Sequence, residues 1–239
     1  GTLTINDNDA TPTLAINDRA ITEAAANATF TVTLSAAAGR DVTVNYATSN
    51  ATATAGADYT AKSGTATISA GDTTTTFTVG VLADSLDEAN ETATLTLSSA
   101  SNAGISDSTG TLTINDNDAT PSLNITSTNL AVANVTTANE NAADATFTVT
   151  LSAVAGRDVT FNYASSNGTA TAGADYTAVN GTLTIAAGDT TGSIAVPVLA
   201  DSLDEANETV TMTLSSASNA TFSDSVATLT ITDDDATPT

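Results

Sequence analysis

The sequence predicts an all-β protein made of two tandem, head-to-tail, seven-stranded antiparallel immunoglobulin-like sandwiches. Three observations support this fold class. Apolar and polar residues alternate at a period of two, turn-forming segments separate the alternating runs, and the whole pattern occurs twice. Short strands at this spacing, without any segment of helical periodicity, are typical of two packed sheets. A chain of 239 residues has room for two such domains.

Seven alternating runs occur in the first repeat. In the clearest one, Phe30, Val32 and Leu34 alternate with threonines, so one face of the strand is predicted to be buried. Threonine is β-branched and polar, which suits the opposite, solvated face. Segments rich in Gly, Ala, Ser, Asn and Asp lie between the runs and predict turns. The predicted strands are centred on residues 14–16, 30–34, 42–46, 66–68, 77–81, 95–97 and 112–114.

Most segments of the first repeat return 117 residues later in the second repeat. The segment VLADSLDEANET begins at Val81 and again at Val198, which is 117 residues later. The segment GTLTINDNDATP begins at Gly1 and again at Gly110, and it returns as ATLTITDDDATP at Ala227. A linker of three residues that ends in proline is too short for a flexible tether. We predict a strand of a preceding repeat at 1–9, a first domain at 10–118, a linker at 119–121 and a second domain at 122–239.

Composition excludes several classes of function. The chain has 27 acidic and four basic residues, and its net charge of −23 repels nucleic acids. It has no cysteine and no histidine, which excludes disulfides, zinc fingers and thiol or imidazole nucleophiles. No apolar run is long enough to span a bilayer, so we expect no membrane insertion of this segment. An acidic, cysteine-free chain rich in Thr, Ala, Ser and Asn suggests an extracellular or cell-surface location on a bacterium.

The acidic residues are predicted to gather at one end of each domain. Alternate loops of an up-and-down sandwich fall at opposite ends, which places nine acidic residues of the first repeat at one end and three at the other. The second repeat divides its acidic residues ten to three. Crowded carboxylates raise one another's pKa values unless a cation compensates. Calcium accepts roughly six to eight oxygen ligands in flexible geometry. We therefore predict bound Ca²⁺, with a solvated acidic rim that holds no metal as the alternative.

These motifs together resemble tandem Calx-beta domains, the calcium-binding sandwich of sodium/calcium exchangers, integrin β4 and many large bacterial surface proteins. The resemblance lies in an early glutamate, the segments ATATAGADY and GTATAGADY, the stretch DEANET and the endings INDND and ITDDD, and it covers essentially the whole chain. It implies about two or three Ca²⁺ per domain, near the inter-domain junctions. The implied metal ligands are Glu23, Asp58, Asp84, Glu88, Glu91, Asp116, Asp118, Glu140, Asp175, Asp201, Glu205, Glu208, Asp233, Asp234 and Asp235.

The expected function is that of a calcium-binding structural repeat that rigidifies an extended extracellular stalk, adhesin or filament. Its expected partners are neighbouring repeats of the same chain, with like chains in a fibre or a cell-surface ligand in addition. The alternative is a glycan- or protein-binding module of an adhesin, in which Tyr59 and Tyr176 stack on sugars; we favour buried packing for both tyrosines. No enzyme is expected, because the acidic residues form a repeated rim without the signals of a catalytic cleft.

Overall fold

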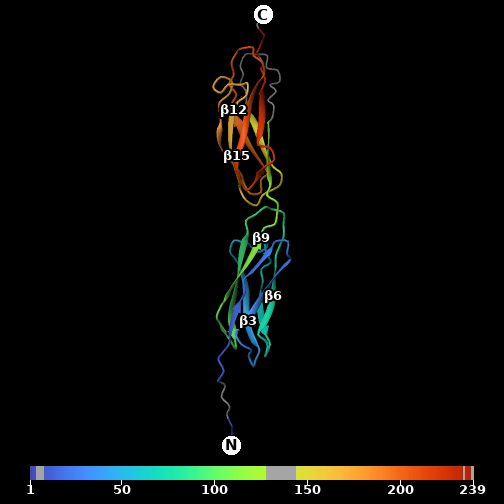
Figure 1. Cartoon of the computed structure of the whole chain (residues 1–239), viewed down its shortest axis with the longest axis vertical. Helices are drawn as coiled ribbons and strands as arrows, with labels where there is room; N and C mark the ends of the chain where they lie inside the picture. The colour runs from blue at the N-terminus through green and yellow to red at the C-terminus, as the bar shows by residue number, and fades with distance from the viewer. Residues whose placement is uncertain (4–7, 128–143, 234, 238–239) are drawn as a thin grey trace. The chain divides into compact units, whose positions relative to one another are not determined.

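A computed structural model describes residues 1–3, 8–127, 144–233 and 235–237. The regular structure of these residues consists of β-strands, which confirms the all-β class. The chain divides into two compact units (Figure 1). The first comprises Gly1–Ser85 and Ala89–Asn117, and the second comprises Leu86–Glu88 and Asp118–Thr239. Among the described residues there is no helix long and apolar enough to cross a membrane.

Two sheets make up the first unit. One has the order β6-β3-β1-β8 and the other the order β2-β9-β7-β4-β5. The strands are β1 (Thr13–Ile16), β2 (Arg19–Thr22), β3 (Asn27–Leu34), β4 (Val42–Asn50), β5 (Ser63–Ile68), β6 (Thr74–Gly80), β7 (Glu91–Ser101), β8 (Gly104–Ile105) and β9 (Thr109–Asn115). The seven predicted strands correspond to β1, β3 to β7 and β9. The structure adds β2 and the two-residue β8.

The described part of the second unit repeats this arrangement. Its sheets have the orders β14-β11-β10-β16 and β13-β12-β15-β17. The strands are β10 (Ser122–Ser127), β11 (Ala145–Leu151), β12 (Val159–Asn167), β13 (Asn180–Ile185), β14 (Thr191–Val196), β15 (Glu208–Ser218), β16 (Thr221–Phe222) and β17 (Val226–Ile231). The central pairs β12 with β15 and β15 with β17 are antiparallel, as are the matching pairs of the first unit.

The strand at the start of the repeat, β1, is followed at once by β2 in the other sheet. β1 pairs antiparallel with β3, whereas β2 pairs in parallel with β9. At the crossing, Asn17 Oδ1 accepts the Thr31 N–H at 2.6 Å, and Asp18 Oδ1 accepts the Thr111 N–H at 2.7 Å. Asp18 is one of the nine acidic residues expected at the acidic end. It lies instead beside the first half of β9, where its hydrogen bond to Thr111 holds the segment between β1 and β2 in place.

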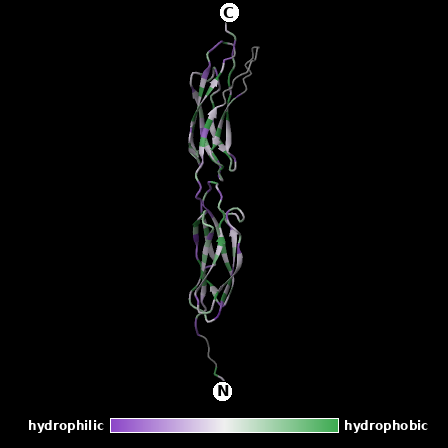
Figure 2. Cartoon of the chain, turned by 90° about the vertical axis from the view of Figure 1, so that its right-hand side faces the viewer, coloured by the Kyte–Doolittle hydropathy of each residue, from purple (hydrophilic) through white to green (hydrophobic). Residues whose placement is uncertain are grey.

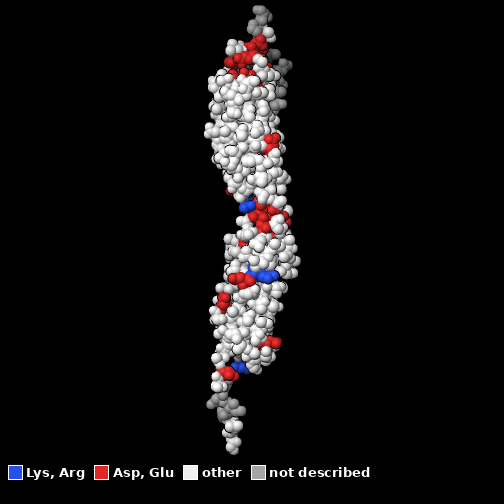
Figure 3. Space-filling model, in the orientation of Figure 1, with Lys and Arg blue, Asp and Glu red and all other residues white. Residues whose placement is uncertain are grey.

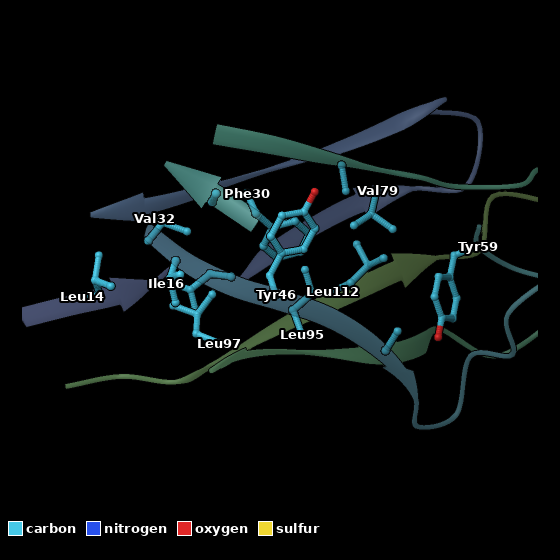
Figure 4. Packing of buried hydrophobic residues seen from close by; sticks show 14 of the residues in the cluster. Leu14, Ile16, Phe30, Val32, Tyr46, Tyr59, Val79, Leu95, Leu97 and Leu112 are labelled. Carbon is cyan, nitrogen blue, oxygen red and sulfur yellow. The ribbon is translucent and has the colours of Figure 1, made fainter. Parts of the chain in front are cut away.

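Each unit has its own apolar core between its sheets, with hydrophobic stretches along the strands (Figure 2). The alternation in the sequence explains this core, because every second side chain of a strand points to the same face. Phe30 and Leu112 are fully buried, and the rings of Tyr46 and Phe77 stack with their centroids 3.8 Å apart. Figure 4 shows Tyr59 apart from the other labelled residues, at one end of the core.

A short segment that follows β6 in the sequence belongs to the second compact unit. This segment is Leu86–Glu88. Its Asp87 is 4% exposed and accepts a 2.6 Å hydrogen bond from Arg157 Nη2. The Asp87 carbonyl also accepts the Gly156 N–H at 3.2 Å. The carboxylate of Asp87 is therefore paired with an arginine.

Candidate metal-binding clusters

Three groups of carboxylates come together in the described residues. In each group, one oxygen per residue lies within 4.8 Å of the corresponding oxygens of the other members. The groups are Glu23 with Asp116 and Asp118, Asp58 with Glu88 and Glu91, and Asp175 with Glu205 and Glu208. Figure 3 shows a dense acidic patch at one end of each unit. The predicted segregation of acidic residues is therefore present in the folded chain.

The Asp175 cluster lies wholly within the second unit. Asp175 belongs to the loop between β12 and β13, Glu205 to the loop between β14 and β15, and Glu208 is the first residue of β15. The loss of water around Glu205 raises the pKa of this exposed side chain, and repulsion from Asp201, from Asp175 and then from Asp233 and Asp235 raises it further. The neighbouring carboxylates therefore disfavour the charged form of Glu205.

The pKa of Glu208 is also raised. Desolvation raises its pKa, a hydrogen bond with the Asp175 side chain adds to the rise, and repulsion from Asp175, Glu205 and Asp201 contributes the remainder. Two carboxyl groups in hydrogen-bond contact share a proton more readily than they carry two full charges. A divalent cation in this position replaces the shared proton and removes the repulsion, so the cluster fits a hard cation that prefers oxygen ligands.

In the Glu23 cluster, hydrogen bonds hold the loop after β2 against the end of β9. The Glu23 N–H donates to the Asn115 carbonyl at 3.0 Å, and the Ala24 N–H donates to Asn117 Oδ1 at 2.9 Å. Glu23 is 7% exposed, and its Oε1 accepts the Asp84 N–H at 3.1 Å. Asn117 therefore holds the loop after β2 close to the cluster. The second repeat has Asp234 at the equivalent position in the sequence.

The surroundings of one oxygen in the Glu23 cluster show whether a cation fits there. Asp118 Oδ2 is buried and accepts no hydrogen bond from any residue that the structure describes. A buried carboxylate oxygen without a donor is costly, because it has lost its water and gained no partner. A bound cation satisfies such an oxygen, so the donor set of this cluster fits a metal of the calcium type.

The Asp58 cluster combines the loop after β4 with the beginning of β7. Asp58 follows the turn after β4, and Glu91 is the first residue of β7. Glu88 precedes Glu91 by three residues, and all three side chains are half-buried. The DY segment and the DEANET segment are separated by about thirty residues in the sequence, and the sandwich brings their carboxylates together.

The remaining predicted ligands have different positions. Asp84 contributes its backbone N–H to Glu23, and Asp201 lies close enough to both Glu205 and Glu208 to raise their pKa values. Asp233 and Asp235 lie close enough to raise the pKa of Glu205. Glu140 and Asp234 are outside the described residues. The role of all fifteen carboxylates as metal ligands stays a prediction.

Two asparagines that the sequence analysis did not single out connect the acidic loops. Asn90 Oδ1 accepts the Asp116 N–H at 3.0 Å, and Asn207 Oδ1 accepts the Asp233 N–H at 3.2 Å. Each asparagine immediately precedes a glutamate of a cluster, namely Glu91 or Glu208. The sequence offered one signal for these two residues, which is that both lie in the repeated DEANET segment. An asparagine is neither charged nor apolar, so neither the charge pattern nor the hydrophobic pattern marks it.

Acidic residues at the opposite end have ordinary structural roles. Asp41 Oδ1 accepts the Ala70 N–H at 2.9 Å, and Asp158 Oδ1 accepts the Ala187 N–H at 2.9 Å. Asp107 Oδ1 accepts the Thr109 N–H at 3.2 Å, and Asp224 makes the equivalent bond at 3.1 Å. Short polar side chains commonly fix turns in this way. These aspartates stabilise turns, and none of them belongs to a described cluster.

Both candidate sugar-stacking tyrosines are buried. Tyr59 is 1% exposed and Tyr176 is 0% exposed. A ring without an exposed face has no surface on which a sugar can stack. The expectation that they pack inside the sandwich is therefore confirmed.

Comparisons with solved structures give weak overall likenesses. The CBD12 domain pair of CALX1.2 is 17% identical over 86% of this chain and 80% of that chain, with a TM-score of 0.43. The apo form of the Calx CBD1 domain is 20% identical over 46% of this chain and 100% of that chain, also with a TM-score of 0.43. A two-domain protein of unknown function from Bacteroides fragilis is 12% identical over 79% and 84%, with a TM-score of 0.33.

The family assignment comes from another comparison. No curated protein matches the chain. The family model described as the Calx-beta domain matches it twice, at residues 7–118 and 124–235. These two matches include the segments that carry all three carboxylate clusters and both copies of the DY motif. The chain therefore belongs to the Calx-beta domain family and contains two tandem Calx-beta domains.

Proposed function

We propose that each repeat binds calcium through the carboxylates at its acidic end. The observation that carries this proposal is the cluster of Asp175, Glu205 and Glu208, in which the pKa values of both glutamates are raised. Without a cation, this arrangement opposes the charged state that the glutamates adopt near neutral pH. Calcium suits it better than magnesium, because calcium tolerates a variable number of oxygen ligands and irregular geometry.

The carboxylates of the first repeat are sufficient to bind about two calcium ions. Its two carboxylate clusters share no residue, and each provides three oxygens from two segments of the chain. Buried Asp118 Oδ2 adds an acceptor that accepts no hydrogen bond from the described residues. Protein carboxylates, backbone carbonyls and water complete calcium shells of roughly six to eight ligands, so three carboxylates are a sufficient core for one ion.

The biological role that we propose is that of a calcium-rigidified segment of an extended stalk, adhesin or filament outside the cell. Only Ala119, Thr120 and Pro121 separate the predicted repeats, and proline restricts the backbone. A ligand that binds only the folded state stabilises it by about 2.7 kcal/mol when its free concentration is a hundredfold above Kd. Extracellular calcium is abundant enough to fill even weak sites, with Kd values of about 10⁻⁴–10⁻³ M.

The proposed partners follow from this role. Neighbouring repeats of the same chain are the first, and like chains or a cell-surface ligand are others. The acidic, cysteine-free composition supports a location outside the cell, on a bacterial surface. No specific feature of the described residues favours a glycan-binding module, since both candidate stacking tyrosines are buried.

A calcium titration of the whole chain tests the proposal. We expect isothermal titration calorimetry to show saturable binding, differential scanning calorimetry to show a higher Tm with calcium than with EDTA, and small-angle scattering to show reduced flexibility with calcium. Magnesium at the same concentration serves as the control and should bind more weakly. Absence of calcium binding would contradict the binding role. Binding without a change in scattering would contradict the stiffening role alone.

A further inference from the structure

In each repeat, a buried tyrosine is hydrogen-bonded to the last residue of a strand. The Tyr59 hydroxyl donates to Asn50 Oδ1 at 2.7 Å, and Asn50 ends β4. Tyr59 directly follows Asp58, a member of a carboxylate cluster. The tyrosine is therefore joined to the proposed metal site through one peptide bond and is anchored at its other end to a strand.

The same asparagine also holds the turn that carries the aspartate. Asn50 Oδ1 accepts a second hydrogen bond, from the Ala55 N–H, at 3.0 Å. Asp58 Oδ2 accepts the Thr54 N–H at 2.6 Å. A carboxylate has about four acceptor positions, so this bond leaves capacity for a cation. The direction of the Asp58 carboxylate is thus set by a turn whose geometry depends on one amide oxygen.

The second repeat contains the same network, entirely within its own unit. The Tyr176 hydroxyl donates to Asn167 Oδ1 at 2.8 Å, and the Ala172 N–H donates to the same oxygen at 3.1 Å. Asp175 Oδ2 accepts the Thr171 N–H at 2.6 Å. Because the bonds recur at equivalent positions and nearly equal lengths, they are a property of the repeat.

Burial of the ring gives this network its rigidity. A buried tyrosine hydroxyl must find a partner, and the rest of its side chain is fixed by apolar packing. Figure 4 shows Tyr59 at the end of the core, apart from the other labelled residues. Between Asn50 and Tyr59 the turn contains only Ala, Thr, Gly and Asp. Thr52 fixes the beginning of this turn, because its Oγ1 accepts the Thr92 N–H at 2.7 Å, and Tyr59 fixes the end.

We propose that Tyr59 with Asn50, and Tyr176 with Asn167, are positioning pairs of the metal sites. Each pair holds the turn in the conformation that presents Asp58 or Asp175 to its cluster, so that the ligand is arranged before the cation arrives. The proposal rests on the proposed calcium-binding function. It assigns a role in affinity to residues that do not touch the metal, as partners outside the ligand shell commonly do.

The test uses the full chain and two matched double variants. The first, Y59F/Y176F, removes only the two hydroxyls that donate to the asparagines. The control, Y46F/Y163F, removes the hydroxyls of the two other tyrosines, which lie against Gly64 and Gly181 in the same sandwiches. We expect Y59F/Y176F to raise the calcium Kd about tenfold. We expect the control to leave Kd unchanged.

A double-mutant cycle separates positioning from general destabilisation. If tyrosine and asparagine act as one unit, N50A/N167A raises Kd about as much as N50A/N167A combined with Y59F/Y176F, because either change alone breaks the pair. Additive effects would contradict the pairing. Hydrogen exchange in EDTA provides a second readout: the amides of Ala55 and Ala172 should exchange faster in Y59F/Y176F, while core-strand amides keep their protection.

The outcomes distinguish this inference from the proposed function. A wild-type chain that binds no calcium contradicts both. A wild-type chain that binds calcium, with Y59F/Y176F binding equally tightly, overturns the positioning role alone. If Y59F/Y176F and Y46F/Y163F weaken binding to the same extent, the effect is one of general stability and the positioning role is again wrong.

Discussion

The backbone N–H of Asp84 donates a 3.1 Å hydrogen bond to Oε1 of Glu23. This bond attaches the loop after β6 to a glutamate that follows β2 and is 7% exposed. Glu23 also shares a carboxylate cluster with Asp116 and Asp118. One side chain therefore joins the loop after β2, the loop after β6 and the exit of β9, which makes it a sensitive position for testing the site.

Replacing Glu23 by glutamine should separate its charge from its hydrogen bond. In E23Q the side-chain carbonyl still accepts the Asp84 N–H, while one negative charge of the cluster is lost. We expect calcium affinity to fall between about fivefold and a thousandfold, because one charge at contact distance contributes about 1 kcal/mol in bulk water and about 4 kcal/mol near a protein surface. Without metal, Tm should stay equal or rise, since repulsion decreases. Titration calorimetry and scanning calorimetry measure the two effects.

The control for E23Q is D41N, at the other end of the first unit. Asp41 accepts the Ala70 N–H, and asparagine retains that acceptor. We expect D41N to bind calcium as the wild type does. Equal affinities of E23Q and the wild type would show that Glu23 does not contribute to the metal site.

The metal-free protein should become less stable as the pH rises from about 4.5. The pKa values of Glu205 and Glu208 lie above their ordinary value of 4.5 in the folded state. Between the unfolded and folded pKa values the folded state binds more protons, so the free energy of unfolding decreases with increasing pH. The loss is complete above the folded pKa values. Scanning calorimetry in EDTA across this pH range measures it.

Calcium should reverse this pH dependence, and one substitution should weaken it. Calcium needs ionised carboxylates, so in its presence the stability of the second unit should increase as the pH rises. In E208Q one of the two titrating glutamates is absent, and the metal-free curve should be flatter than that of the wild type. A metal-free wild type whose stability increases over the same range would contradict the raised pKa values.

Changing Asn117 to aspartate should strengthen the first repeat's site. Asn117 Oδ1 accepts the Ala24 N–H, and an aspartate oxygen retains this bond while adding a negative charge near the Glu23 cluster. We expect calcium affinity to increase several-fold, and metal-free stability to fall through repulsion. Titrations in low and high salt should show the larger gain in low salt. Unchanged affinity in low salt would place Asn117 outside the electrostatic reach of the site.

A core substitution should affect stability without changing the site. Leu112 of β9 is fully buried. Leu112→Ala leaves a cavity and should lower the free energy of unfolding of the first repeat by about 2–5 kcal/mol, with or without calcium. Denaturant unfolding measures this loss, and titration calorimetry at a temperature where the variant is folded should give the wild-type Kd. A large change in Kd would show that the packing of the core also sets the geometry of the site.

Local patterns in the sequence determined the β class, the duplication and most strands. The alternation around Phe30 and Val32 is sufficient for this, because a strand has a side-chain period of two wherever it lies. The crossing from β1 to β2 in the other sheet was not predicted. It depends on hydrogen bonds that the side chains of Asn17 and Asp18 accept from residues 14 and 93 positions away in the chain. No local pattern reports such bonds.

The sequence by itself also determined which residue types crowd at one end of each repeat, since topology places alternate loops together. Only the tertiary structure decided how they divide: Glu23 joins Asp116 and Asp118, while Asp58 joins Glu88 and Glu91. It also decided that Asp87 pairs with Arg157 and that Asn50 holds the turn before Asp58. The physical reason is the distance along the chain over which each kind of interaction acts. Composition and periodicity record local preference, whereas ligand geometry depends on contacts between segments that meet only when both sheets have packed.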